Sequence, residues 1–102
     1  MLKPHGNSRK NKKPHHLYEI IDKEVDDVFK YGISAEQIGK DGLSRRIRSQ
    51  LTLMNTIAGI MRFFARIIIR DIPGRKEARS LEDAHIKAYQ QKHGKPPRGN
   101  SK

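Results

Sequence analysis

The sequence has no cysteine and no tryptophan, and only 6% of its 102 residues are aromatic. Without cysteine, the chain can form neither a disulfide nor a thiolate zinc site. So few aromatic side chains argue against a platform on which the bases of a single strand would stack. The lack of cysteine fits a reducing compartment, and we expect a cytoplasmic protein.

A long hydrophobic run is also missing, and its absence argues against a membrane anchor. A spanning helix needs about 20 mostly apolar residues, but the best candidate, IAGIMRFFARIII, is interrupted by Arg62 and Arg66. Each arginine would cost about 3 kcal/mol at the centre of a bilayer. The basic N-terminus is followed by no apolar segment, so we expect no signal peptide.

Acidic residues are scarce relative to basic ones. The chain has 22 lysines and arginines against 11 acids, a formal net charge of +11. This excess predicts a polyanionic partner, with double-stranded DNA as the first expectation and RNA as the alternative. A DNA-binding protein of this kind would be associated with the nucleoid.

The basic residues gather first at the N-terminus. Residues 1–16 contain no acid and two prolines, which predicts a disordered basic arm able to follow a phosphate backbone. Residues 94–102 are predicted to be a short flexible tail, and residues 17–93 a helical domain. The basic residues of the arm that we expect to contact nucleic acid are Arg9, Lys10, Lys12 and Lys13.

Apolar residues in the rest of the chain recur at helical spacing. This spacing predicts a helix over 17–31, a short helix after Ser34, a long helix over 45–70 capped by Ser44, and a last helix over 80–93. Gly32 and Gly94 would end the first and last of these helices. The expected fold is therefore all-α, a small bundle of three to four helices.

The predicted long helix carries arginines on one face and two apolar seams on the other. Guanidinium and amide side chains suit phosphates and base edges. We therefore predict a nucleic-acid surface on this helix, extended by the loop that follows it. Its residues are Arg45, Arg48, Asn55, Arg62, Arg66, Arg75 and Lys76.

Catalysis and metal binding have little support in the sequence. It contains no glycine-rich phosphate loop and no nucleophile spaced from a base. His15 and His16 are adjacent rather than one helical turn apart, and no third ligand stands near them. We expect a binding protein rather than an enzyme, with no cofactor and no metal.

Two stretches, TIAGIMRFFARII and SLEDAHIKAYQQ, resemble the core-binding, SAM-like domain of tyrosine recombinases, the phage integrases. Leu81, Asp83, His85, Ile86, Ala88 and Tyr89 carry the resemblance in the second stretch. It implies a DNA-holding module from a mobile genetic element, of the kind used in DNA integration and recombination. The chain lacks the family's catalytic residues, so the resemblance does not imply a recombinase.

A third reading is a protein-interaction module. The four-three spacing of the apolar seam is what a helical dimer would use. In that case the apolar face would meet a second copy of the chain.

Overall fold

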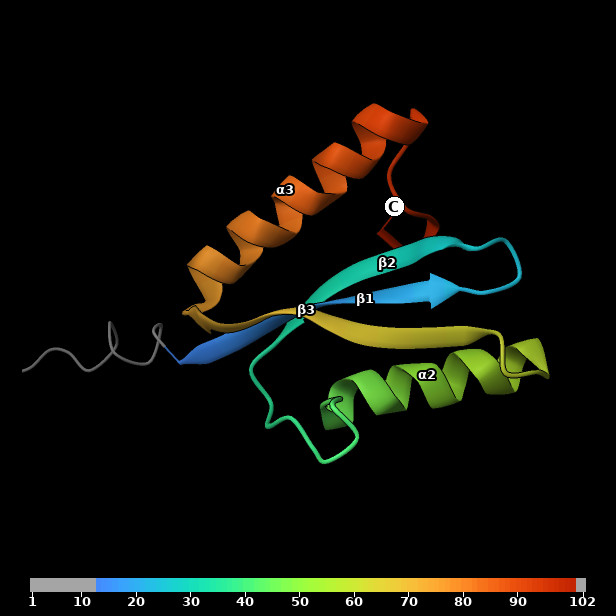
Figure 1. Ribbon diagram of the computed structural model, residues 1–102, viewed down its shortest axis with the longest axis horizontal. Coiled ribbons are helices and arrows are strands. Elements are labelled where there is room, and N and C mark those ends of the chain that lie inside the picture. The colour runs from blue at the N-terminus through green and yellow to red at the C-terminus, as the bar shows by residue number, and fades with distance from the viewer. Residues whose placement is uncertain (1–12, 101–102) are drawn as a thin grey trace, which may run out of the picture.

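The computed structural model describes residues 13–100. A three-stranded antiparallel sheet, in the order β2-β1-β3, carries one long helix on each face (Figure 1). The elements in chain order are β1 (Pro14–Asp22), β2 (Asp27–Ser34), α2 (Arg45–Ala58), β3 (Phe63–Pro73), α3 (Arg75–His93) and a 3-10 turn, η1 (Arg98–Asn100). The fold is α+β, so the predicted all-α bundle is wrong.

The first predicted helix is instead a β-hairpin. β1 and β2 pair antiparallel around a turn over residues 23–26, in which Asp26 has a positive φ of 54°. β1 is the central strand, and its residues from His15 to Ile20 are all buried. Because both faces of this strand are covered, its sequence lacks the alternation of apolar and polar residues that reveals a strand with one wet face.

The segment predicted as one long helix over 45–70 is instead a helix, α2, followed by a strand, β3. α2 ends at Ala58, and Gly59 caps it in the left-handed conformation with a φ of 76°. The Asn55 carboxamide then holds the reversal, because its Oδ1 accepts hydrogen bonds from the backbone N–H groups of Arg62 (2.9 Å) and Phe63 (2.7 Å). Phe63 begins β3, whose β-branched and aromatic residues favour a strand.

The helix boundaries were predicted in part. α2 begins directly after Ser44, as expected, although the Ser44 side chain makes no capping hydrogen bond within the described residues. α3 ends at His93 with Gly94 as its left-handed cap, also as expected, but it begins at Arg75 rather than at 80. The short helix predicted after Ser34 is a loop, closed by a single bridge between Ile38 and Ser44.

Each face of the sheet has its own apolar core. On the α2 face, Tyr18, Ile20, Ile47 and Phe63 form a buried cluster. On the α3 face, the cluster consists of Leu17, Ile72 and Ala78. Within residues 13–100, no helix combines the length and apolarity needed to cross a membrane.

The C-terminal residues are fixed to the hairpin rather than forming a free tail up to Asn100. The Asn100 carboxamide pairs with the backbone of Tyr31 on β2, accepting from its N–H at 2.8 Å and donating to its carbonyl at 2.9 Å. Arg98 donates to the buried carboxylate of Asp22, which also holds Arg62. These contacts cover part of the outer edge of β2.

Candidate functional site

A cavity of about 370 Å³ lies beside β2, between the beginnings of α2 and α3. We call it the edge cavity. Five basic side chains line it, against two carboxylates, so its charge suits an anion. The charged residues are Lys13, Lys30, Arg46, Arg75 and Arg79, with Glu36 and Glu82.

Tyr18 projects from the central strand into the wall of the edge cavity. Its ring lies across Gly32, its partner on β2, where a Cβ atom would overlap the phenol. Gln50 of α2 donates a hydrogen bond from Nε2 to the Tyr18 hydroxyl oxygen at 3.0 Å. The phenol is 1% exposed as a residue and is thus fixed from two sides, with its own O–H still able to donate.

Glu82 is the carboxylate that α3 contributes. Arg75 and Arg79 precede Glu82 by seven and three residues along α3, which places all three on one side of the helix. Burial, the larger cause, and the neighbouring Asp83 raise the pKa of Glu82, while Arg79, Lys30 and Arg75 act to lower it. The result is a partly buried carboxylate surrounded by cations.

Glu36 belongs to the loop between β2 and α2, and it caps α2. Its Oε1 accepts a hydrogen bond from the backbone N–H of Arg46 at 2.6 Å. This carboxylate therefore supplies the helix cap that Ser44 does not, and it sits at the positive end of the helix dipole. An anion held at this end of α2 would meet the same N–H groups.

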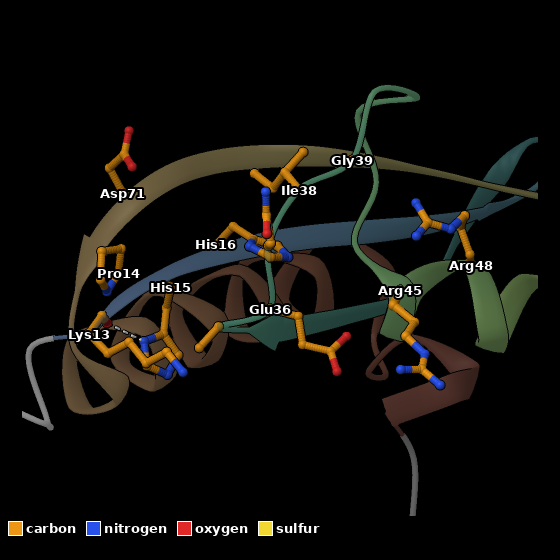
Figure 2. Close-up of a pocket in the computed structure, with 12 residues that line it drawn as sticks. Lys13, Pro14, His15, His16, Glu36, Ile38, Gly39, Arg45, Arg48 and Asp71 are labelled. Atoms are coloured by element: carbon orange, nitrogen blue, oxygen red, sulfur yellow. Dashed lines mark hydrogen bonds between the residues drawn. The ribbon is translucent and has the colours of Figure 1, made fainter.

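A second, larger cavity adjoins the first. This loop cavity, of about 750 Å³, lies between β1, residues 35–39 and the beginning of α2, and it shares Lys13, His15, Ala35 and Glu36 with the edge cavity. Figure 2 shows His16 in its middle, between the Lys13–His15 end of β1 and the two α2 arginines, Arg45 and Arg48. The four shared residues make the two cavities neighbours.

Some residues predicted from the sequence come together at these cavities. Lys13 lines both of them, Arg75 lines the edge cavity, and Arg45 and Arg48 line the loop cavity. Arg48 also donates to Asp41 and to the Leu43 carbonyl, both at 3.0 Å, so it braces the loop. Arg9, Lys10 and Lys12 of the predicted arm lie outside the described residues.

Other predicted residues have structural partners elsewhere. Arg62 pairs with Asp22 at 2.8 Å, Arg66 pairs with Glu19, and Asn55 holds the turn before β3. Lys76 is exposed on α3 and lines neither cavity. The predicted stripe is not continuous, because Arg62 and Arg66 follow the end of α2.

The sequence analysis missed the residues that give the edge cavity its chemistry. Neither Tyr18 nor Glu82 is among the residues predicted from the sequence to contact nucleic acid. Arg75, Arg79 and Glu82 do have helical spacing in the sequence, and this was a usable signal. Tyr18 and Lys30 had none, because only the folded chain brings both of them to the edge cavity.

Comparison with known protein families gives one match. The model of a family described as "URI fold toxin 2" matches residues 8–94, most of the chain. The chain belongs to this family. No curated protein and no solved structure matches it.

The family match overturns the resemblance to tyrosine recombinases, and with it the expectation of a role in DNA integration or recombination. The residues that suggested it do lie on a helix, α3, but the helix covers a sheet. Leu81 packs against the Leu17 and Ile72 cluster, and Tyr89 donates to Asp27 of β2 at 2.5 Å. A leucine, an alanine and a tyrosine at helical spacing suit a helix that packs on a sheet as well as one that packs in a helical bundle.

Proposed function

We propose that this toxin domain binds the sugar–phosphate backbone of nucleic acid in the edge cavity and hydrolyses it. The observation that carries the proposal is a single cavity lined by five basic side chains, by the partly buried carboxylate of Glu82 and by the Tyr18 phenol. Arg79, Lys30 and Arg75 are near enough to Glu82 to act on its pKa. The family described as toxins supports an activity that damages a cell component. Nucleic acid is the polyanion that fits both the cavity and the net charge of +11.

Arginine and lysine give the edge cavity its affinity for phosphate. Arg79 and Arg75 of α3 and Arg46 of α2 approach from two elements, so a phosphate between them would be contacted from both sides. Contacts of this kind release counterions, so binding should weaken steeply with salt. Duplex DNA and RNA both carry such phosphates, so the phosphate contacts alone are compatible with either.

Glu82 fits the role of a ligand for Mg²⁺. This ion keeps several waters and commonly takes only one or two carboxylates, the remaining ligands being substrate phosphates. The described residues contain no cluster of three His, Asp or Glu side chains, so a site of this open kind is the one the cavity could offer. The surrounding arginines oppose the ion until a phosphate arrives, so we expect the two to bind together.

Hydrolysis then requires an attacking water, a stabilised phosphate and a proton for the leaving oxygen. Mg²⁺ supplies an acidified water when bound. The new bond joins the water oxygen to phosphorus, the proton that this water loses passes to bulk solvent, and the bond from phosphorus to the leaving sugar oxygen breaks. Arg46 and Arg79 would hold the developing negative charge, and the Tyr18 O–H would donate a proton to the leaving oxygen. The buried phenol would regain a proton from water that enters the edge cavity when the product leaves.

This proposal departs from the expectation that the chain is not an enzyme. No observation tests that expectation directly. The reason to set it aside is the combination of Tyr18, Glu82 and the arginines, which only the folded chain brings together. A nucleic-acid target would place the activity in the cytoplasm, at the nucleoid if the target is DNA.

A matched pair of α3 variants tests the proposal. Arg79→Ala and Lys76→Ala each remove one positive charge from the same helix, but only Arg79 lines the edge cavity. We expect Arg79→Ala to reduce cleavage of a labelled nucleic acid with Mg²⁺ by roughly 100-fold, a typical cost of removing one transition-state donor. Lys76→Ala should change the rate by less than about threefold.

Equal losses in the two variants would mean that total charge, rather than the edge cavity, governs the activity. A competition between duplex DNA and duplex RNA of equal length would then identify the preferred target. The RNA alternative predicts that RNA competes the better of the two. Failure of the wild-type protein to cleave any of these nucleic acids, duplex or single-stranded, would contradict the proposal.

Self-association is the second candidate, because the apolar seam of the sequence is partly exposed. Leu53 and Ile57 of α2 and Met61 of the following turn are 61%, 77% and 74% exposed. Such a patch is typical of a contact surface. Analytical sedimentation with Ile57→Glu as the comparison tests it: a dimer that the substitution dissociates supports a homodimer, and a monomer at all concentrations excludes one.

A further inference from the structure

The loop cavity adjoins the proposed phosphate site but differs from it in chemistry. Its volume of about 750 Å³ is within the range of cavities that bind organic ligands. Pro14, Ala35 and Ile38 give it apolar walls, which a phosphate does not need. Because Glu36 and His15 line both cavities, a ligand that fills one would reach the other.

His16 is the unusual residue of this cavity. It is 3% exposed, and its Nε2 has no hydrogen-bond partner among residues 13–100. A buried polar atom without a partner is destabilising, so its presence in a folded protein calls for an explanation, and a bound ligand is one. Burial, the largest cause, and the neighbouring His15 and Arg70 lower the pKa of His16. This shift favours the neutral imidazole, which can both donate and accept a hydrogen bond.

The remaining polar groups provide both kinds of hydrogen bond. Arg45 carries guanidinium donors, and Glu36 carries carboxylate acceptors (Figure 2). Donors, acceptors and apolar walls together match a nucleobase, whose edge is polar and whose faces are apolar. A bare phosphate would use only the donors and would be repelled by Glu36.

We propose that the loop cavity is a nucleobase subsite, which takes one unstacked base of the strand whose phosphate lies in the edge cavity. The inference rests on the proposed function and narrows its substrate. A base inside a duplex is stacked and paired, so it must leave the duplex to enter a cavity. The substrate is therefore single-stranded nucleic acid, or an unpaired segment, rather than intact duplex DNA.

Two oligonucleotides of equal charge test this subsite. One is a labelled single strand of eight nucleotides, and the other has the same phosphates but abasic sugars. Binding is measured by fluorescence anisotropy in EDTA, so that neither probe is cleaved. We expect the wild-type protein to bind the strand with bases at least about tenfold more tightly, the usual scale for one well-held base.

Two substitutions should remove this preference without affecting backbone binding. His16→Leu deletes the unpartnered imidazole, and Ile38→Trp fills the cavity from its loop. Each should lower affinity for the strand with bases to that for the abasic strand, and leave abasic binding within about twofold of wild type. Ile38→Trp decides the test if His16→Leu does not fold, because Ile38 is outside the sheet.

The outcomes separate this inference from the proposed function. Equal wild-type affinities for the two probes would overturn the base subsite while backbone binding stands. Unchanged preference in Ile38→Trp would also overturn it, because a filled cavity could not hold a base. Binding of neither probe at low salt would overturn the proposed function itself, and the subsite with it.

Discussion

The phenol ring of Tyr18 occupies the space that a side chain at Gly32 would fill. The two residues are cross-strand partners on β1 and β2, and the ring passes over the glycine to reach the edge cavity. Gln50 then fixes the hydroxyl from α2. The position of the proposed proton donor thus depends on the absence of one methyl group from the neighbouring strand.

The first prediction concerns this contact. Gly32→Ala should destabilise the domain by about 1 to 3 kcal/mol, the usual cost of overpacking, because the ring must move away from Gln50. Urea denaturation measures the change. In a Tyr18→Leu background the same substitution should cost at least 1 kcal/mol less, since the shorter side chain leaves room. Equal costs in both backgrounds would show that the ring does not oppose the Cβ atom.

The second prediction concerns Asp22, whose buried carboxylate holds Arg62 at 2.8 Å and also accepts from Arg98. These hydrogen bonds, with that from Arg62 the largest cause, hold the pKa of Asp22 well below its usual 3.8. The stability that this ion pair contributes is therefore present above about pH 4 and is lost as pH falls through the lower pKa of the folded state.

Asp22→Asn should accordingly lower the melting temperature at pH 7 by at least about 5 °C and flatten the loss of stability below pH 4. Arg62→Ala should also lower it, whereas Arg70→Ala, an exposed β3 arginine, should not. Calorimetry at several pH values measures all three. A melting temperature for Arg62→Ala equal to that of the wild type would show that the pair with Asp22 does not stabilise the fold. Arg62 could then contact nucleic acid, as the sequence predicted.

The third prediction is the pH dependence of cleavage. Burial raises the pKa of Glu82 above its ordinary 4.5, so the carboxylate becomes protonated, and loses Mg²⁺, at a higher pH than an exposed glutamate would. The acid limb of the rate profile should therefore have its midpoint above pH 4.5. Asp83→Asn should move this midpoint to lower pH, because Asp83 is one of the groups that raise the pKa of Glu82.

A shift in the opposite direction is expected for Arg79→Ala, because this arginine acts to lower the same pKa. Residual cleavage is enough to measure the midpoint. A profile that neither substitution moves would mean that another group governs the acid limb.

The sequence predicted helix ends better than it predicted strands. Ser44 before α2 and Gly94 after α3 are local signals, and both boundaries are where they were expected. The hairpin turn over residues 23–26 contains no glycine, proline or asparagine, so nothing in the sequence interrupted the predicted helix. β1 is buried on both faces, and its apolar residues fit a helical spacing as readily as a strand.

Gly59 was the missed signal within the long predicted helix. A glycine inside a helix costs only about 1 kcal/mol relative to alanine, so the apolar spacing outweighed it in the prediction. In the structure it is the left-handed cap of α2, and the chain reverses directly after it into β3. Arg62 and Arg66 consequently left the helix on which the predicted binding stripe had placed them.

The candidate site was predictable only where its residues are local. Arg45, Arg48 and Arg75 belong to basic segments near helix starts, and all three line one of the two cavities. Tyr18, Gly32 and Glu82 come from two strands and a helix, and their proximity depends on the pairing of β1 with β2. Because the segments of β1 and β2 were predicted to be helical, their pairing could not be predicted from the sequence.

The most direct test of the proposed nuclease activity is the rate at which Glu82→Gln cleaves a labelled single-stranded oligonucleotide in Mg²⁺, relative to the wild-type protein. We predict cleavage by the wild type that EDTA abolishes, and a loss of at least about 100-fold in Glu82→Gln. Binding in EDTA should be retained by the variant, because the substitution removes a negative charge from a cavity that holds phosphate. A Glu82→Gln variant that cleaves at the wild-type rate would contradict the account.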